Sequence, residues 1–463
     1  MTTVEATETE IPREVWRLAW LIACGAFATG LDTSVVHVAL RTIQLEYDVT
    51  LAAAQWVSTS YLIALAVSLP VCGWLGDRLG TGRLWLGALA AFTVASGLCA
   101  AAPSLELLVA ARVLQGLAAG LLVPAGQTIL GRAVGPGRLG RVMSRLGMAV
   151  ALAPALGPVL GGLLLDDLGW RWLFLVNLPI GAVVLLAARR LLPTPPGSAG
   201  TPLDGVGLAA LSIGLPCTVY GLTALGAGGF HPVPILVIGL AALALYVVRS
   251  RFRPEPLLDL GLLRIPAFRA AGATMAVAGV LIFGSTLLYP LYFQLARHED
   301  VLTTGLLTFA LGLGTALTLP RAGRLVDRYG GGRVALAGGL LDLAVSIELV
   351  SVGVDQPILV IQLLLLLQGA GTALLAVPLT VAAYAAVPPH RLADAAVQVN
   401  IVNRIGGALG AAIFVVVIDR DLAAGPAVAL RHAFAWQLGA AALSVVGALL
   451  LTRVQRAGPP RAG

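Results

Sequence analysis

The sequence contains no lysine, few charged residues and few residues of the kinds that hold metals or act as nucleophiles. Only 11% of its 463 residues are charged and 58% are hydrophobic, whereas a soluble domain carries about 25% charged residues. There are five histidines, scattered singly, and four cysteines. These shortages exclude a water-soluble protein and leave no cluster for a membrane enzyme. We therefore predict an integral membrane protein that is not an enzyme, with no metal site and no cofactor.

Other familiar features are also missing. Residues 1–15 are polar and acidic, with no basic segment and no cleavage site, so residues 16–40 are predicted to be a retained first span. The arginines do not gather on one soluble face, which argues against nucleic-acid binding. The cysteines all fall in apolar stretches and are expected to be small buried side chains rather than disulfide partners or metal ligands. They are Cys24, Cys72, Cys99 and Cys217.

Long apolar runs dominate what is present. Each is close to the length of about 20 residues that a helix needs to cross the hydrocarbon core of a bilayer, and solid apolar blocks exclude the alternating strands of a membrane barrel. We predict an all-α fold with fourteen transmembrane helices. Their expected ranges are 16–40, 52–75, 84–102, 105–131, 142–165, 171–188, 205–226, 232–248, 268–294, 302–321, 333–354, 357–387, 394–418 and 430–452.

The arginines orient these spans. With a cytoplasmic N-terminus, 23 of the thirty arginines fall in cytoplasmic segments, five fall outside, and two, Arg112 and Arg404, fall within spans. This asymmetry is the positive-inside pattern. It predicts a multi-pass protein of the cell (inner or plasma) membrane with both termini in the cytoplasm, and it disfavours an odd number of spans.

Two loops repeat each other. The segments 73–83 and 323–333 share glycine, aspartate and arginine positions at a constant offset of 250 residues. Many secondary transporters are built from such repeats, with the substrate path between the halves. The predicted organisation is a cytoplasmic tail (1–15), an N-terminal six-helix bundle (16–190), linkers with two inserted helices (191–267), a C-terminal six-helix bundle (268–452) and a cytoplasmic tail (453–463).

Four motifs in register resemble one family. The loop Gly-x-Leu-x-Asp-Arg-x-Gly is similar to motif A of the major facilitator superfamily. The stretch 31–40 (LDTSVVHVAL) resembles the first-helix signature of its 14-helix drug–proton antiporter branch, the multidrug efflux type. Residues 112–116 (RVLQG) resemble motif B, and residues 153–162 (APALGPVLGG) resemble motif C, the antiporter motif. The resemblance covers essentially the whole chain and implies two six-helix major-facilitator bundles plus two inserted helices.

Asp32 and Arg112 are the predicted proton-coupling residues. A carboxylate deep in a span is costly unless it is paired, protonated or faces a cavity, and the family commonly uses this acid for coupling. Arginine keeps its proton, so Arg112 would act by biasing a nearby carboxylate. The plainer alternatives are a structural hydrogen bond for Asp32 and helix-to-helix contact for Arg112.

Two further sets of residues follow from the motifs. The two loops are expected to act as a gate, while the glycines and prolines of motif C predict a bent, closely packed helix. Ordinary close packing would need the same residues. The gating residues are Gly73, Asp77, Arg78, Gly80, Arg83, Asp327 and Arg328, and the antiporter-motif residues are Pro154, Gly157, Pro158, Gly161 and Gly162.

Polar and aromatic side chains within the spans are candidates for a substrate cavity, although several would serve equally well as contacts between helices. They are Gln55, Tyr61, Gln115, Tyr289, Tyr292, Gln294, Asp342, Gln368, Asn400 and Asn403. One of Asp342 and Glu348 is a candidate second protonation or cation site, and a position near the lipid headgroups or in an aqueous cleft would explain either residue equally well. His37 and Arg41 depart from the family signature and are expected to be tolerated substitutions near the outer mouth, or, for His37, a pH-responsive element.

The expected function is export of amphipathic or cationic drugs or antibiotics from the cytoplasm by a proton-coupled antiporter that works by alternating access. The alternative is a dedicated proton-coupled exporter or importer of a single metabolite. The expected partners are a small-molecule substrate, protons and the lipid bilayer, with the proton gradient as the energy source and a monomer as the working unit.

Overall fold

The computed structural model describes residues 11–197, 202–227, 231–253, 256–351 and 356–457. Within these ranges the chain is helical throughout, with no β-strand. The helices are α1 (Arg13–Glu46), α2 (Leu51–Ala54), α3 (Trp56–Ser68), α4 (Cys72–Leu79), α5 (Thr81–Ala101), α6 (Leu105–Val134), α7 (Leu139–Leu168), α8 (Trp172–Leu175), α9 (Asn177–Leu191), α10 (Gly205–Ala227), α11 (Pro232–Ser250), α12 (Pro266–Leu291), α13 (Val301–Tyr329), α14 (Gly331–Ser351), α15 (Ile358–Ala385), α16 (Leu392–Asp421) and α17 (Pro426–Ala457).

The described residues contain twelve helices that are long and apolar enough to cross a membrane, and a thirteenth span if α3 and α4 are counted as one bent helix. The bend between α3 and α4 is 59° and falls at Pro70, which has no N–H to continue the helical hydrogen bonds. Each of the fourteen predicted ranges overlaps a helix, so an all-helical membrane protein is confirmed, and the count of fourteen stays a prediction.

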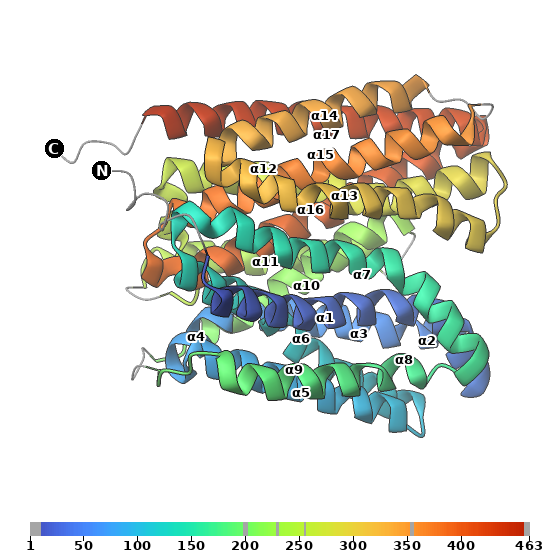
Figure 1. The fold of residues 1–463 in the computed structure, drawn as a ribbon. Coiled ribbons are helices and arrows are strands. Elements are labelled where there is room, and N and C mark those ends of the chain that lie inside the picture. Colours follow the sequence, from blue (N-terminus) through green and yellow to red (C-terminus); the bar gives the residue numbers. More distant parts are fainter. Residues whose placement is uncertain (1–10, 198–201, 228–230, 254–255, 352–355, 458–463) are drawn as a thin grey trace.

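The helices form two side-by-side groups (Figure 1). α1 to α9 make one group and α12 to α17 the other, and the groups meet where α7 packs on α13 and α6 on α16. The α10–α11 pair packs on itself and lies against α16 and α3. α1 begins and α17 ends at the same end of the bundle (Figure 1), which we call the terminal end.

The internal repeat appears in the packing as well as in the sequence. A Cβ atom on Gly116 of α6 would lie 2.4 Å from the carbonyl oxygen of Tyr61 on α3. A Cβ atom on Gly369 of α15 would lie 2.0 Å from the carbonyl oxygen of Leu311 on α13. Glycine allows the backbones to approach this closely, so both halves use the same helix crossing.

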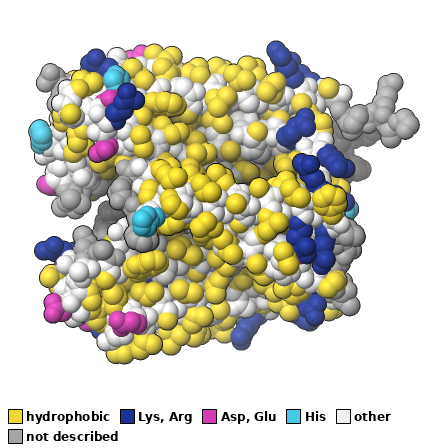
Figure 2. All heavy atoms as spheres, turned by 180° about the vertical axis from the view of Figure 1, so that it is seen from behind, with side chains coloured by type: hydrophobic (Ala, Val, Ile, Leu, Met, Phe, Trp, Pro, Cys, Tyr) yellow, Lys and Arg dark blue, Asp and Glu magenta, His cyan; other side chains and the backbone are white. Residues whose placement is uncertain are grey.

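The apolar core is continuous at the terminal end and divided at the other. One cluster of buried side chains joins both halves there, through residues such as Leu146 on α7 and Leu319 on α13. Towards the opposite end, one cluster belongs to the first half, around Trp170, and another to the second half, around Phe434. The halves are therefore closed against each other at the terminal end. Figure 2 shows a notch between them at the opposite end and a wide hydrophobic band around the bundle.

Candidate functional site

A closed network of polar side chains lies inside the first half. Arg112 of α6 donates hydrogen bonds through Nη1 to Asp32 Oδ2 of α1 at 2.5 Å and to Gln115 Oε1 at 2.6 Å. Gln115 Nε2 donates to Asp32 Oδ1 at 2.9 Å and to Ser96 Oγ of α5 at 2.6 Å. Asn177 of α9 donates to the same Asp32 oxygen at 3.2 Å. Four side chains from α5, α6 and α9 thus form a network around one carboxylate of α1.

The Arg112 guanidinium is fixed on every side. Its Nε donates to the carbonyl oxygen of Val57 at 2.9 Å, and its Cζ atom lies 4.1 Å from the centre of the Tyr61 ring and 5.6 Å from that of Phe174. Asp32 is 0% and Arg112 1% exposed. A buried ion pair is tolerated when its remaining donors and acceptors are satisfied, and here both Asp32 oxygens and the Nε and Nη1 atoms of Arg112 have partners.

α1 also connects the network to the motif C helix. A Cβ atom on Gly157 of α7 would lie 1.9 Å from Ser34 Oγ, and one on Gly30 would lie 2.8 Å from the Ala153 Cβ. Ser34 Oγ donates to the Ala153 carbonyl oxygen at 3.3 Å. The predicted close packing of motif C is therefore against α1, the helix that carries Asp32. The side chains of Pro154, Pro158 and His37 lie outside the described set.

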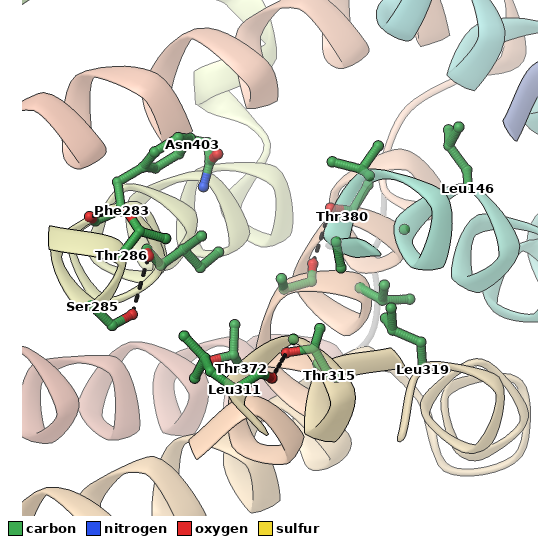
Figure 3. Close-up of a pocket in the computed structure, with 18 of the residues that line it drawn as sticks. Leu146, Phe283, Ser285, Thr286, Leu311, Thr315, Leu319, Thr372, Thr380 and Asn403 are labelled. Atoms are coloured by element: carbon green, nitrogen blue, oxygen red, sulfur yellow. Dashed lines mark hydrogen bonds between the residues drawn. The ribbon is translucent and has the colours of Figure 1, made fainter. Parts of the chain in front are cut away.

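A cavity of about 520 Å³ lies between the halves. Its wall is formed by α6, α7, α12, α13, α15 and α16, and Figure 3 shows Phe283, Asn403, Thr315, Thr372 and other side chains arranged around it. No charged side chain is among the described residues that line it. A mostly apolar pocket with a few hydroxyl and amide groups suits an amphipathic organic molecule.

Amide groups connect the two halves at this cavity. Asn400 of α16 donates to Gln127 Oε1 of α6 at 2.7 Å, and the Tyr384 hydroxyl of α15 donates to the same oxygen at 3.0 Å. Gln127 and Asn400 both line the cavity. A cargo that contacts either residue would therefore lie next to the hydrogen bond that joins the two halves.

The predicted cavity residues are distributed over several environments. Tyr289, Asn400 and Asn403 line the cavity. Tyr61 and Gln115 belong to the Asp32 network, Tyr292, Asp342 and Gln368 are buried elsewhere in the second half, and Gln55 and Gln294 are exposed.

The second motif loop is engaged with the first half. Asp327 at the end of α13 accepts hydrogen bonds from the Gly140 backbone N–H at 2.8 Å and from Arg141 Nε at 2.9 Å. Both donors stand at the start of α7, where the positive end of the helix dipole favours a carboxylate. A Cβ on Gly140 would lie 2.5 Å from the Gly323 carbonyl oxygen, so α7 and α13 touch at this point. We call this contact the α13 latch.

The first motif loop is less firmly held. Asp77 lies 3.8 Å from Arg132 and is 59% exposed. The Arg78 guanidinium lies over the Trp74 ring at 5.3 Å. Gly80 has a φ of +88° between α4 and α5, a conformation that favours glycine. Arg83 and Arg328 are both exposed at the same end, and the Arg328 guanidinium lies near the Tyr329 ring.

Some residues of these sites are absent from the sequence-based predictions. Ser96 and Asn177 complete the Asp32 network, Gln127 joins the halves, and Arg141 holds the α13 latch. Asn177 and Ser96 are single polar residues in apolar runs. That pattern was the available signal, because a lone amide within a span needs a buried partner.

Two helical halves that close at one end around a central cavity define a membrane transporter. The chain belongs to the Major Facilitator Superfamily, whose family model matches residues 22–411. The resemblance inferred from the motifs is therefore confirmed, and the protein is a multi-pass membrane transporter and not an enzyme.

Named relatives agree with this assignment. The chain is 37% identical over 412 residues to a protein of Mycobacterium tuberculosis named multidrug resistance protein B homolog, covering 87% of this chain and 76% of the relative. It is 28% identical over 406 residues to the multidrug export protein EmrB of Haemophilus influenzae, covering 86% and 79%. The crystal structure of the human organic anion transporter MFSD10 (TETRAN) has the same fold, with a TM-score of 0.66 and 18% identity, covering 95% of this chain and 100% of that one.

Proposed function

We propose that this protein exports amphipathic or cationic organic compounds from the cytoplasm in exchange for protons. The observation that carries the coupling is the buried Asp32–Arg112 pair, a titratable group placed in the middle of the bundle and shielded from the cavity. The printed names of the relatives from M. tuberculosis and H. influenzae support drug export. The apolar, uncharged cavity wall supports an amphipathic cargo.

The proposed topology has fourteen spans with both termini in the cytoplasm of a cell (inner or plasma) membrane. The twelve apolar helices and the bent α3–α4 pair supply thirteen, and α7 is the proposed fourteenth. Most arginines on the face seen in Figure 2 gather at the terminal end, which supports a cytoplasmic position for that end. The working unit is proposed to be a monomer that needs no cofactor.

In the proposed cycle, protonation of Asp32 removes the attraction that holds α1 to Arg112 on α6. α1 also contacts α7 through Ser34, and α7 packs on α13 of the other half. A change in the Asp32 network therefore has a direct path of packed helices to the contact between the halves. With the latch at the terminal end closed and the opposite end divided, the conformation described here is the proposed outward-facing state, in which the Asp32–Arg112 pair is intact.

Transport in reconstituted vesicles tests this proposal. A pH gradient is imposed, and a panel of cationic dyes, neutral amphipathic drugs and small hydrophilic metabolites is followed in the wild type, Asp32→Asn and Glu46→Gln. Glu46 is the matched control, because it lies on the same helix but is exposed. We expect several dyes and drugs to accumulate in the wild type and Glu46→Gln, and none in Asp32→Asn.

Two results would argue against parts of the proposal. Transport of one hydrophilic metabolite alone would favour the dedicated single-substrate transporter. Gradient-driven transport at the normal rate in Asp32→Asn would remove Asp32 from the coupling step.

A further inference from the structure

A second buried carboxylate lies in the other half, with no counterion among the residues that the structure describes. Asp342 of α14 is 0% exposed, and neither of its carboxylate oxygens has a hydrogen-bond partner among the described residues. Gln368 of α15 is also 0% exposed, with its amide nitrogen and oxygen both unpartnered, and Ser346 Oγ is unpartnered as well. Three polar side chains without partners in one buried region require an explanation.

The three side chains face the same contact between helices. A Cβ on Gly371 would lie 2.1 Å from Asp342 Oδ1, so the carboxylate lies directly against α15. Gln368 is three residues before Gly371 and therefore on the same face of α15, and Ser346 is four residues after Asp342 on the same face of α14. Asp342 is the twelfth of the 21 residues of α14, close to the middle of the span.

The internal repeat relates this cluster to the Asp32 network of the first half. α5 and α14 are both 21 residues long and start 250 residues apart, and the glutamines of α6 and α15 are 253 residues apart. The residues related in this way are Ser96 with Ser346, Gln115 with Gln368, and Arg112 with Leu365. The second half thus retains the serine and the glutamine, has leucine in place of the arginine, and carries its acid on α14.

Without an arginine, an ionised Asp342 would be an unpaired charge in the middle of the membrane, which proteins avoid. Tyr289 of α12 packs in the same buried cluster as Val345, three residues after Asp342 on α14, and its hydroxyl is the titratable group of the described residues on which Asp342 acts electrostatically. α15 contains no charged residue. The charged residues on α14, on α13 and α17, which pack against it, and on α12, which carries Tyr289, stand towards the helix ends or, for Glu348, on the exposed face. They are Arg333 and Glu348 on α14, Arg431, His432, Arg453 and Arg456 on α17, Arg269 on α12, and Arg321, Arg324, Asp327 and Arg328 on α13.

We infer that Asp342 is a second proton-binding site, occupied in the conformation described here, with Gln368 and Ser346 as its polar neighbours. A proton needs one oxygen atom, whereas a metal cation needs several, and the described residues contain no group of three acidic, histidine or cysteine side chains able to hold a metal. A neutral carboxylic acid beside an amide and a hydroxyl is a far cheaper group to bury than a bare carboxylate.

Tyr289 connects this site to the central cavity. It lines the cavity, and its hydroxyl accepts a hydrogen bond from Gln437 Nε2 of α17 at 2.8 Å, which leaves the O–H free to donate. We assign Tyr289 as the residue past which the proton of Asp342 reaches the cavity. A role for this proton in transport rests on the proton coupling proposed above. The binding of a proton by Asp342 does not depend on that proposal.

Infrared spectroscopy of the full-length protein in lipid nanodiscs, without any cargo, tests the site directly. At neutral pH we expect a carbonyl band of a protonated carboxylic acid in the wild type that is lost in Asp342→Asn. The band should remain in Glu348→Gln, the matched control on the same helix, and in Asp32→Asn. In Tyr289→Phe the band should remain, but the change in its intensity after a pH jump should be slower, because the proton reaches Asp342 more slowly.

Other outcomes overturn the inference. If Asp342→Asn removes an ionised carboxylate band and leaves the carboxylic acid region unchanged, Asp342 is charged. If Asp342→Asn does not fold, Gln368→Leu and Ser346→Ala provide the test, because each should shift the frequency of the band; no shift in either contradicts the assignment. A protein that transports nothing yet keeps the Asp342 band would count against the proposed function alone.

Discussion

The two halves share the same helix packing but differ in how their buried carboxylates are paired. In the first half, Asp32 is paired with Arg112 and both carboxylate oxygens accept hydrogen bonds, and Asn177 Oδ1 is the buried atom of the five-residue network without a partner among the described residues. In the second half, Asp342 and Gln368 are equally buried and have none. The repeat therefore preserved the helix crossings and not the electrostatics. This difference suggests that the first half holds a strongly organised, charged network, and the second half a neutral site.

The α13 latch and the contact of α4 with α16, which we call the α4 latch, differ in the same way. α7 and α16 each follow a three-residue helical turn, Pro136–Arg138 and Pro389–Arg391. The third residue of α7 is Arg141, which holds Asp327. The third residue of α16 is Asp394, an acid in the position where the other latch has a base. A Cβ on Gly73 of α4 would lie 3.0 Å from Asp394 Oδ1, and the charges of Asp259, Asp77 and Arg391 all act on Asp394. One latch is thus attractive and the other repulsive.

The largest effect is expected from breaking the charged network. Arg112→Met leaves Asp32 buried without a counterion, which should lower the free energy of unfolding by about 3–5 kcal/mol. Thermal and denaturant unfolding of the purified protein measure the loss. Arg404→Met is the control, since Arg404 is a partly buried arginine of α16 for which the described residues provide no ion pair; an equal loss in both variants would mean that the Asp32 pair is not special.

The shared packing predicts equal effects in the two halves. Gly116→Ala and Gly369→Ala each place a methyl group against a backbone carbonyl of the neighbouring helix. Overpacking of this kind costs about 1–3 kcal/mol, and unfolding of each variant should show a similar loss. A large loss in one half with none in the other would contradict the common helix crossing.

The latches should give coupling energies of opposite sign. A double-mutant cycle of Asp327→Asn with Arg141→Gln should show an attraction of about 1–2 kcal/mol, because the hydrogen bonds at the α13 latch involve charged groups. The cycle of Asp77→Asn with Asp394→Asn should show a smaller repulsion, at most about 1 kcal/mol, since Asp77 is exposed. Attraction in both cycles would remove the proposed asymmetry.

The smallest effect concerns the exposed ion pair on α1. Glu46 accepts hydrogen bonds from Arg171 and from Trp170 Nε1. Partial burial works in the opposite direction, but these bonds and the Arg171 charge together lower the pKa of Glu46. The stabilisation is therefore present above the ordinary glutamate pKa and is lost as the pH falls through the lowered value. Glu46→Gln should cost less than about 1 kcal/mol at pH 7 and nothing in acid; a pH-independent loss would assign the effect to packing.

The sequence was sufficient for the helices and the repeat. Runs of apolar residues specify spans because a bilayer has one thickness, and the glycine and aspartate positions of the two loops stand at a fixed offset. The sequence also predicted that Arg112 would act on a nearby carboxylate, since charged groups within spans need partners. The bend at Pro70 and the overlap of every expected span with a helix follow from the same local rules.

Local sequence patterns do not predict which residues form the Asp32 network and the central cavity. Asn177 reaches Asp32 across 145 positions and Gln127 reaches Asn400 across 273, and no local pattern specifies which faces of distant helices meet. The cavity wall is equally non-local. Among the ten anticipated residues, Tyr289, Asn400 and Asn403 line it. Its hydroxyl residues, such as Ser285 and Thr308, bond to carbonyl oxygens of their own helix, so their sequence positions do not distinguish them from hydroxyl residues outside the cavity.

The most direct test of proton coupling at Asp32 compares two modes of transport in the same vesicles. A cationic dye is followed first as exchange with no gradient and then as accumulation driven by a pH gradient. If Asp32 carries the proton, Asp32→Asn keeps the exchange and loses the accumulation, while Glu46→Gln keeps both. Gradient-driven accumulation of the dye by Asp32→Asn at the wild-type level would contradict the assignment of Asp32 as the coupling residue.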